Sequence, residues 1–275
     1  MAENASGKQH QAHVPVENDV AVPSVARIYD YLLGGKDNYA ADRKAAQQLI
    51  DISPNAAVGI RENRAFLQRA VRYAAQAGVR QFIDIGSGLP TQGNVHEIAR
   101  TIAPGSRVVY VDNDPVVAVH GRALLLDDTG NTAFVQADLR QAKRILHEPA
   151  VTKLIDFGRP VAILLAAVLH FVSDAEDPRA HLADLREATA PGSLLVLSHG
   201  TADPFPEKGE RAAQVYQAAT AGLSLRSQPD ILRFFEGYDL VEPGLVYAPT
   251  WHPEAPPTLS DPRSSGLLVG IGRRR

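Results

Sequence analysis

One ten-residue stretch constrains the fold of this chain more than any other. Residues Phe82–Thr91 read FIDIGSGLPT, a short apolar run followed by Gly86 and Gly88. Glycine lets a chain turn sharply and leave its backbone amides uncovered. Pro90 has a φ that suits the first turn of a helix, and apolar residues recur at helical spacing over Val95–Ile102. A strand, a glycine turn and a helix in this order are typical of a nucleotide-cofactor site at the carboxyl edge of a parallel sheet.

The residues of this turn favour a positively charged cofactor over a dinucleotide. The dinucleotide motif G-x-G-x-x-G needs Gly or Ala where Thr91 stands. That motif also needs no acidic residue two positions before its first glycine, where Asp84 stands, and the Asp84 carboxylate would repel a pyrophosphate. The D-x-G-x-G spelling, with Ser87 between the glycines, resembles the D/E-x-G-x-G motif of S-adenosylmethionine (SAM) methyltransferases, although Pro90 replaces a third glycine. The alternative is that the turn only joins a strand to a helix.

The composition narrows the class of protein. The 275 residues are 45% apolar, enough for one large α/β domain or two small ones. The absence of cysteine excludes disulfides, cysteine nucleophiles and cysteine-ligated metals, and it fits a cytoplasmic protein. No apolar run has the ~18 residues of a membrane span, and the net charge of −3 argues against a nucleic-acid partner. The nine histidines form no metal motif, so we expect no metal.

Strands and helices alternate after the glycine turn, which predicts a doubly wound α/β sheet over residues 79–275. The last two predicted strands have no helix between them, so one of them must be antiparallel. We therefore expect seven strands, mostly parallel, with the last one antiparallel. After the strand that ends at the glycine turn, the other six are predicted at 107–111, 132–137, 160–172, 193–198, 245–247 and 266–271.

Polar residues follow the second and third predicted strands. Asp112, with Asn113 beside it, could accept hydrogen bonds from both ribose hydroxyls of a nucleotide cofactor. Each such charge-assisted bond contributes ~1.5–3 kcal/mol. Asp138 could accept from an adenine amino group while Leu139 covers the ring, and it could also cap the helix that follows. Asp114 precedes a proline and is expected to be a helix N-cap.

The longest apolar run, 160–172, is expected to be a central strand of the sheet. Ala166 falls near its end and is small enough to let a ligand approach. His170 follows, and its imidazole could serve as a general base. A histidine flanked by Leu169 and Phe171 could equally be structural.

Residues 1–22 show no periodicity and are predicted to be a disordered tail, and residues 23–78 are predicted to form a helical cap. Ser24 is expected to N-cap the first helix, and a glycine pair that includes Gly35 ends it. Two further helices are predicted at 39–50 and 60–77. The cap could cover a cofactor or simply pack on the domain.

Taken whole, the chain from Pro23 to Arg273 resembles the actinobacterial S-adenosyl methyltransferase family. The segments that carry the resemblance are Ser24–Arg43, Arg61–Tyr73, Phe82–Thr91, Val108–Pro115 and Ala166–Val172. The resemblance implies a class I methyltransferase fold and SAM binding, and Pro90 is normal in that family. The cofactor residues that we predict on this basis, together with Ser87 and Ala166, are Asp84, Gly86, Gly88, Asp112, Asn113, Asp138 and Leu139. Candidates for the mouth of the site, because they fall in family motifs, are Tyr31, Gly35, Asn38 and Arg64.

These features predict a SAM-dependent methyltransferase that acts on a small-molecule acceptor. The acceptor is not specified by any residue, and neither is an oligomeric state. The ring of Tyr29 or Tyr31 could face the sulfonium as a cation–π partner, and His170 is the candidate base if the acceptor is an alcohol. Two alternatives stay open: a SAM-binding protein without catalysis and an NAD-linked oxidoreductase.

Overall fold

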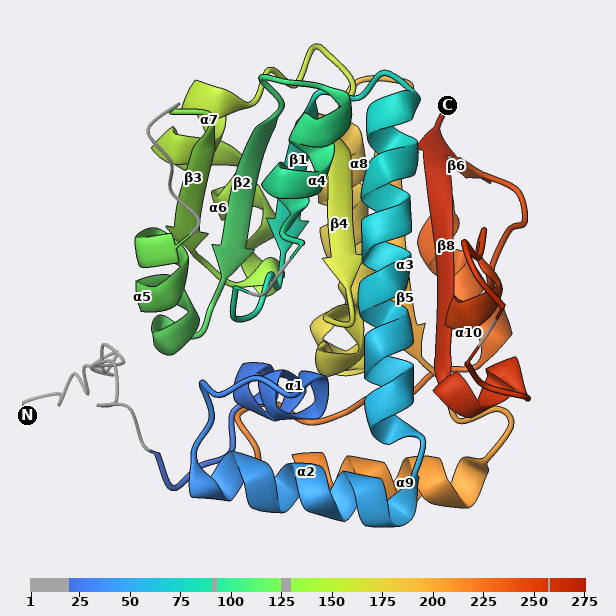
Figure 1. The fold of residues 1–275 in the computed structure, drawn as a ribbon. Helices are drawn as coiled ribbons and strands as arrows, with labels where there is room; N and C mark the ends of the chain where they lie inside the picture. The colour runs from blue at the N-terminus through green and yellow to red at the C-terminus, as the bar shows by residue number, and fades with distance from the viewer. Residues whose placement is uncertain (1–19, 91–92, 125–129, 257) are drawn as a thin grey trace, which may run out of the picture.

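A twisted sheet with helices on both faces forms the centre of the computed structural model, which describes residues 20–90, 93–124, 130–256 and 258–275 (Figure 1). The predicted tail, 1–22, lies outside this part of the chain except for its last three residues. The described strands are β1 (Gln81–Ile85), β2 (Arg107–Asp112), β3 (Thr132–Gln136), β4 (Ala162–Ala166), β5 (Leu194–Gly200), β6 (Tyr238–Leu240), β7 (Val246–Tyr247) and β8 (Leu267–Arg274).

The strand order confirms the predicted fold class. Along the sheet it is β3-β2-β1-β4-β5-β8-β6, with the first five strands parallel and β8 antiparallel to β5. The described chain has eight strands where we expected seven, because the three-residue β6 was not predicted. Both β6 and β7 pair antiparallel with β8, at successive positions along its length. They are thus two pieces of one edge strand, interrupted around Pro243, which has no N–H to donate to a ladder.

Alternate residues of the strands pack on opposite faces, so the strands read as continuous apolar runs. Ile83, Val109 and Leu165 pack against helices on one face. Phe82, Val108 and Leu164 pack against helices on the other face. The first set of helices is α6 (Ala142–His147), α7 (Pro149–Leu154), α8 (Pro178–Ala188) and α10 (Gln228–Leu232), and the second is α3 (Ala56–Gln76), α4 (Val95–Ile102) and α5 (Pro115–Leu124).

A smaller helical layer covers the carboxyl ends of the strands. It comprises α1 (Val25–Leu33), α2 (Ala40–Ile52) and α9 (Pro206–Tyr216), which lie below the arrowheads in Figure 1. Ile28, Leu32 and Ala46 form a buried cluster of their own, against which Val215 of α9 packs. The cap is therefore built from segments far apart in the sequence, whereas α3, predicted as part of it, runs from this layer along the sheet.

The structure corrects three local predictions. Pro90 starts no helix, because α4 begins at Val95 behind an Asn94–Glu97 capping box. The apolar run 160–172 is a strand only over β4, since Ala167 has a φ of 57° and turns the chain away. Ser24 precedes α1 but does not cap it with its side chain, which bonds elsewhere. No helix in the described ranges is long and apolar enough to cross a membrane.

Candidate functional site

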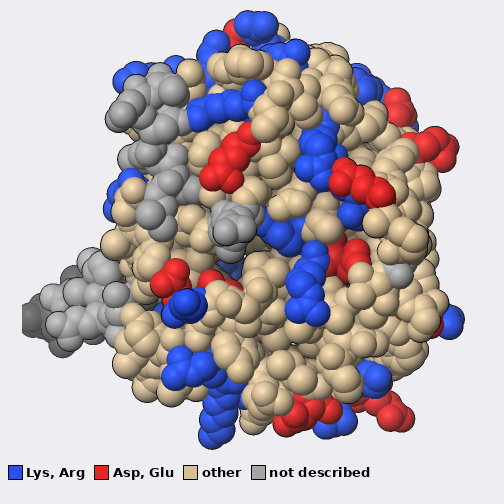
Figure 2. Space-filling model, viewed as in Figure 1, with Lys and Arg blue, Asp and Glu red and all other residues tan. Residues whose placement is uncertain are grey.

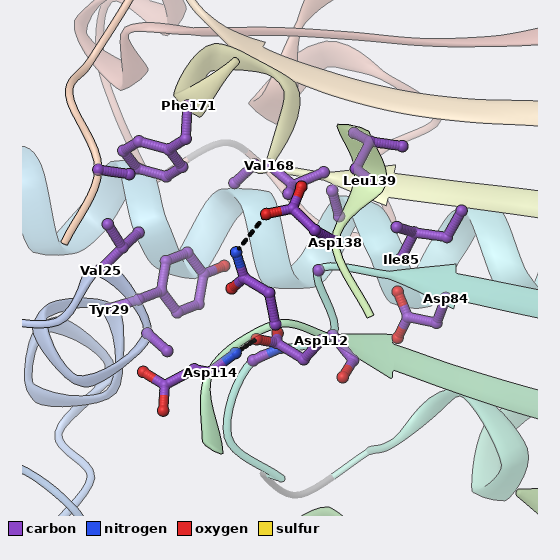
Figure 3. Close-up of a pocket in the computed structure, with 18 of the residues that line it drawn as sticks. Val25, Tyr29, Asp84, Ile85, Asp112, Asp114, Asp138, Leu139, Val168 and Phe171 are labelled. Atoms are coloured by element: carbon purple, nitrogen blue, oxygen red, sulfur yellow. Dashed lines mark hydrogen bonds between the residues drawn. The ribbon is translucent and has the colours of Figure 1, made fainter. Parts of the chain in front are cut away.

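A cavity of about 330 Å³ lies where the carboxyl edge of the sheet meets the cap. Its volume falls in the range of small-molecule sites, about 300–1,000 Å³. Figure 3 shows Asp84, Asp112 and Asp138 around it, with Val25 and Phe171 on the opposite side in that view. All nine predicted cofactor residues line it: Asp84, Gly86, Ser87, Gly88, Asp112, Asn113, Asp138, Leu139 and Ala166.

The glycine turn has the shape that its sequence requires. Gly86 and Gly88 have φ values of 74° and 65°, in the left-handed region that side chains disfavour. A Cβ on Gly86 would lie 2.4 Å from Cγ2 of Val168, so the loop that follows β4 (the β4 loop) packs directly on this glycine. The Gly86 amide donates to the carbonyl of Val111 at 2.8 Å, which fixes the turn to β2.

Asp112 joins this turn to the end of β2. Its Oδ2 accepts from the Gly88 amide at 2.8 Å, and its Oδ1 accepts from the Asp114 amide at 3.0 Å. Burial raises the pKa of Asp112 to about 6, against the opposing effect of these amides. Each oxygen can accept a second hydrogen bond. The carboxylate is therefore held in place with capacity left for a ligand.

Asp84 and Arg64 form a second charged region of the cavity. Asp84 is buried, and no donor in the described chain hydrogen-bonds to its carboxylate. Burial raises its pKa to about 7, Arg64 lowers it and Asp112 raises it. Arg64 reaches the cavity from α3 and donates from Nη2 to the Gly93 carbonyl at 3.0 Å. Its Nε and the Oγ of Ser87 are buried without a partner.

Asp138 lies at the end of β3 and caps the short turn that follows, as predicted. Its Oδ1 accepts from the Arg140 amide at 2.9 Å, and its Oδ2 accepts from Asn113 Nδ2 at 2.9 Å (Figure 3). The Arg140 guanidinium also donates to both oxygens and to the carbonyl of Phe171. These bonds fill the four acceptor positions of the carboxylate. An adenine amino group would take the place of the exposed Asn113 donor, so this role of Asp138 stays a prediction.

His170 is not brought to the cavity. It follows β4 as predicted, but it is buried and its Nδ1 accepts from the Gly200 amide at 3.0 Å. Its ring packs edge-on against Phe171 and His199. Burial, together with His199 and Arg226, holds its pKa well below the usual value. The base role remains a prediction, and these contacts favour the structural alternative.

Three of the four mouth candidates also lie elsewhere. The loop that carries Gly35 and Asn38 wraps around Asp30: Asn38 Nδ2 donates to its Oδ2 at 2.9 Å. A Cβ on Gly35 would lie 2.0 Å from Asp30 Oδ1, which explains the glycine. Tyr31 packs on the cap cluster. Of the four candidates, Arg64 alone lines the cavity.

The wall of the cavity that the cap and the loop after β4 form was largely missed by sequence reasoning. Tyr29 lines it, and its hydroxyl is held by Asn63 Nδ2 at 2.9 Å. Val25, Val168 and Phe171 add apolar surface. The i, i+4 spacing on α1 did signal a buried helix face, but that spacing is the same for a core face and a ligand face. The other members of this wall include Ser24, Ala26, Val172, Thr220 and Ala221.

A hydrogen bond joins the N-terminal end of α1 to the side of the cavity that holds the predicted cofactor residues. Ser24 Oγ donates to Asp114 Oδ2 at 2.6 Å. Its Oδ1 accepts from the Val116 amide at 2.8 Å. Asp114 therefore caps the start of α5, as predicted. The cap and the loop after β2 are thus joined through one carboxylate. Within the described ranges, no group of three or more metal-binding side chains occurs.

Comparisons with known proteins agree with this geometry. A family model described as S-adenosyl methyltransferase matches residues 10–275. A DUF574 family protein from Streptomyces avermitilis is 41% identical, with a TM-score of 0.90 over 94% of this chain and 99% of that one. A protein from Thermobifida fusca described as a methyltransferase is 42% identical, with a TM-score of 0.87 over 94% and 97%. No curated protein matches the chain.

More distant structures share the fold. An O-methyltransferase family protein from Burkholderia thailandensis is 16% identical, with a TM-score of 0.52 over 83% of this chain and 62% of that one. The N-methyltransferase NodS from Bradyrhizobium japonicum, solved with S-adenosyl-L-homocysteine, is 15% identical, with a TM-score of 0.50 over 90% and 98%. These findings support a methyltransferase, and they give no support to an NAD-linked oxidoreductase or to a protein without catalysis.

Proposed function

Since the chain belongs to the S-adenosyl methyltransferase family, we propose that it methylates a small molecule with a largely apolar surface. Its cofactor is SAM. The observation that carries the proposal is the division of one cavity into a polar side, which holds every predicted cofactor residue, and an apolar wall formed by the cap and the loop after β4. Cytoplasmic location remains the prediction made from the cysteine-free composition.

The polar side fits the cofactor in its donor and acceptor chemistry. Asp112 would accept from the ribose hydroxyls, because its two bonded amides orient it without exhausting its lone pairs. Leu139 would cover the adenine, with Asp138 at its edge. Gly86 and Gly88 leave the backbone bare for close approach. The ring of Tyr29 lines the same cavity and would face a positive charge, a role that the position of Tyr31 does not allow.

When bound, SAM supplies an electrophilic methyl group. The contribution of this chain is to hold an acceptor in line with that group and to exclude water, and such positioning can supply about 7–11 kcal/mol of the barrier. The bond between Ser24 and Asp114 keeps α1 over the cavity. Val25, Phe171 and Ala221 would bind the acceptor by burying its apolar surface.

The apolar wall offers no free proton acceptor in the described structure. The Tyr29 hydroxyl accepts from Asn63, and burial raises its pKa. Thr220 Oγ1 accepts from the Val25 amide at 3.3 Å, and Ser24 Oγ donates to Asp114. We therefore propose that the acceptor enters with its nucleophilic atom already free of a proton, as an acidic phenol, a thiophenol or a nitrogen of low pKa does near neutral pH.

The test is a single-turnover assay with methyl-labelled SAM and a panel of acceptors. The panel contains phenols and thiophenols of graded acidity, matched aliphatic alcohols and an extract of small metabolites. We expect label in apolar products, with a pH profile whose midpoint follows the pKa of each acceptor. A midpoint that stays fixed across acceptors would place the base on the protein. Tight SAM binding with no labelled product from any fraction would favour the noncatalytic alternative.

A further inference from the structure

We propose that Arg226 is a positioning residue for the acceptor, because it fixes the loop that carries Phe171 and so sets the shape of the apolar wall. This inference rests on the proposed function, since it takes that wall as the acceptor side of the cavity. Arg226 is buried, and it is not among the described residues that line the cavity. It would therefore act on the acceptor through the groups that it holds and not by direct contact.

Four of the five N–H groups of the Arg226 guanidinium bond to the β4 loop. Nη2 donates to the Val172 carbonyl at 2.8 Å, and Nη1 donates to the Leu169 carbonyl at 3.4 Å. Nε and Nη2 also donate to Asp174 Oδ1, at 2.9 and 2.7 Å. The two carbonyls flank Phe171 in the sequence. The guanidinium therefore holds the loop on both sides of the ring that lines the cavity.

The fifth N–H bonds to a buried histidine of β5. Arg226 Nη1 lies 2.9 Å from His199 Nε2, and this nitrogen must accept because a guanidinium only donates. His199 Nδ1 then carries the proton and donates to the Gly200 carbonyl at 2.7 Å. Burial lowers the pKa of His199 to about 3, with Arg226 acting in the same direction and the Gly200 bond against it. The neutral ring thus anchors the guanidinium on β5.

The remaining carbonyls of this turn are also bonded from outside it. The His170 carbonyl accepts from the Ser224 amide at 2.7 Å, and the Phe171 carbonyl accepts from Arg140 at 2.9 Å. The Phe171 ring lies 4.4 Å from the His170 ring and 5.3 Å from the Tyr216 ring, measured between centroids. Four successive carbonyls and the ring between them are therefore fixed before any acceptor arrives.

The segment before Arg226 supplies a second part of the apolar wall. Thr220 and Ala221 line the cavity, and the Thr220 amide donates to the Pro23 carbonyl at 2.9 Å, next to α1. Arg226 sets where this segment meets the β4 loop, so two parts of the wall depend on one guanidinium. A wall that is already ordered spares the acceptor the free energy of ordering it on binding.

Equilibrium binding of a flat phenol tests this role without turnover. The probe is 2-naphthol, whose fluorescence reports binding, titrated into protein saturated with S-adenosylhomocysteine. Arg226→Lys keeps the charge, but a compact ammonium cannot hold carbonyls on both sides of Phe171. We expect this variant to bind 2-naphthol about 3- to 10-fold more weakly, which corresponds to ordering one side chain on binding. Its affinity for S-adenosylhomocysteine should stay within about twofold of the wild-type value.

Arg69→Lys is the matched control. Arg69 donates from Nε to the Trp251 carbonyl at 2.8 Å and from Nη2 to the Ala248 carbonyl at 2.9 Å, so it also holds two carbonyls of one loop. None of these three residues is among the described ones that line the cavity. The control should therefore lower the free energy of unfolding and leave the affinity for 2-naphthol unchanged.

Asp174→Ala is a second variant that removes a partner of Arg226 from the outside. The Asp174 side chain is 86% exposed, so its loss leaves the core intact. We expect 2-naphthol to bind this variant about twofold more weakly. If Arg226→Lys does not fold, Asp174→Ala decides the question: a weaker affinity supports the role, and an unchanged one refutes it.

Three further results would overturn the role of Arg226. Unchanged affinity of folded Arg226→Lys for 2-naphthol would show that the wall keeps its shape without the guanidinium. Equal weakening of 2-naphthol and S-adenosylhomocysteine would show that Arg226 only supports the fold. An equal loss in Arg69→Lys would show that any drop in stability loosens the wall. Failure of the proposed function looks different, because the wild type itself would then bind S-adenosylhomocysteine without binding 2-naphthol.

Discussion

At the scale of single residues, the site is dominated by carboxylates that the fold buries without a cation. Asp84 lies near the end of β1, and Asp112 ends the neighbouring strand β2. Burial raises the pKa of Asp84 to about 7 and that of Asp112 to about 6. Their convergence was predictable, because parallel strands end at one edge of the sheet. It was not predictable that Asp84 would have no hydrogen-bond donor while Asp112 accepts from two backbone amides, since a sequence does not show which donors a fold brings near. We infer that the two charges are kept for a ligand at a cost in stability.

Asp84→Asn measures that cost. In the unliganded wild type, a pKa raised from 3.8 to about 7 means that the folded state binds the proton more tightly than the unfolded state. Stability then falls as the pH rises from about 4 to about 7 and is constant above that. Relative to wild type, Asp84→Asn should gain stability over the same window, reaching on the order of 4 kcal/mol at pH 8. Denaturant unfolding at pH 5, 6.5 and 8 checks this, and a difference that does not grow with pH would contradict it.

His170 shows where a residue's chemistry misleads. A histidine after a central strand suggested a general base, but the backbone turn at Ala167 carries it to the Gly200 amide. We expect His170→Asn to lower the free energy of unfolding and to reduce kcat by less than tenfold. A general base contributes about 10²–10⁴-fold. A loss of that size, with normal cofactor affinity, would support the base role predicted from the sequence.

At the scale of elements, the glycine turn and the β4 loop form one unit. Gly86 and Gly88 both have positive φ, but Val168 packs on Gly86 whereas Gly88 has open space where a Cβ would be. The sequence predicted the turn because D-x-G-x-G has few other uses. It did not indicate the partner, because Val168 lies in a different loop, far along the chain.

Substituting the two glycines separates backbone strain from steric clash. Each alanine would adopt a disfavoured φ, at a cost of about 1 kcal/mol. Gly86→Ala must also displace Val168 from a 2.4 Å contact, so it should destabilise the unliganded protein by about 1–3 kcal/mol more than Gly88→Ala. Chemical denaturation compares the two variants directly. Equal losses would show that the β4 loop gives way freely.

The cap illustrates a second limit at this scale. Helical spacing predicted α1, α2 and α3, and the structure confirms all three. That α9 completes the layer, and that the loop with Gly35 and Asn38 closes on Asp30 instead of a ligand, depends on contacts between distant segments. A loop rich in polar groups can satisfy its own hydrogen bonds, so its composition alone does not mark a binding site.

At the scale of the whole molecule, the sheet places every predicted cofactor residue around one cavity. Alternation of strands and helices was sufficient for the fold class, since a parallel sheet covered on both faces is the usual outcome of that pattern. The alternation of strands and helices did not predict the split edge strand, because β6 is too short for a periodic signal. It did not predict the apolar wall either. Figure 2 shows acidic and basic side chains intermingled over the coloured part of one face, without a broad field of either sign.

The central claim is that this edge binds an adenosyl sulfonium through the carboxylate that ends β2. Titration calorimetry of SAM and NAD into the wild type and Asp112→Ala tests it, with circular dichroism to show that the variant is folded and Asp112→Asn as a less disruptive companion. We predict that the wild type binds SAM and not NAD, and that Asp112→Ala binds SAM at least about tenfold more weakly, as loss of charge-assisted ribose bonds requires. A wild type that binds no SAM, or a folded Asp112→Ala with unchanged affinity for it, would contradict the account.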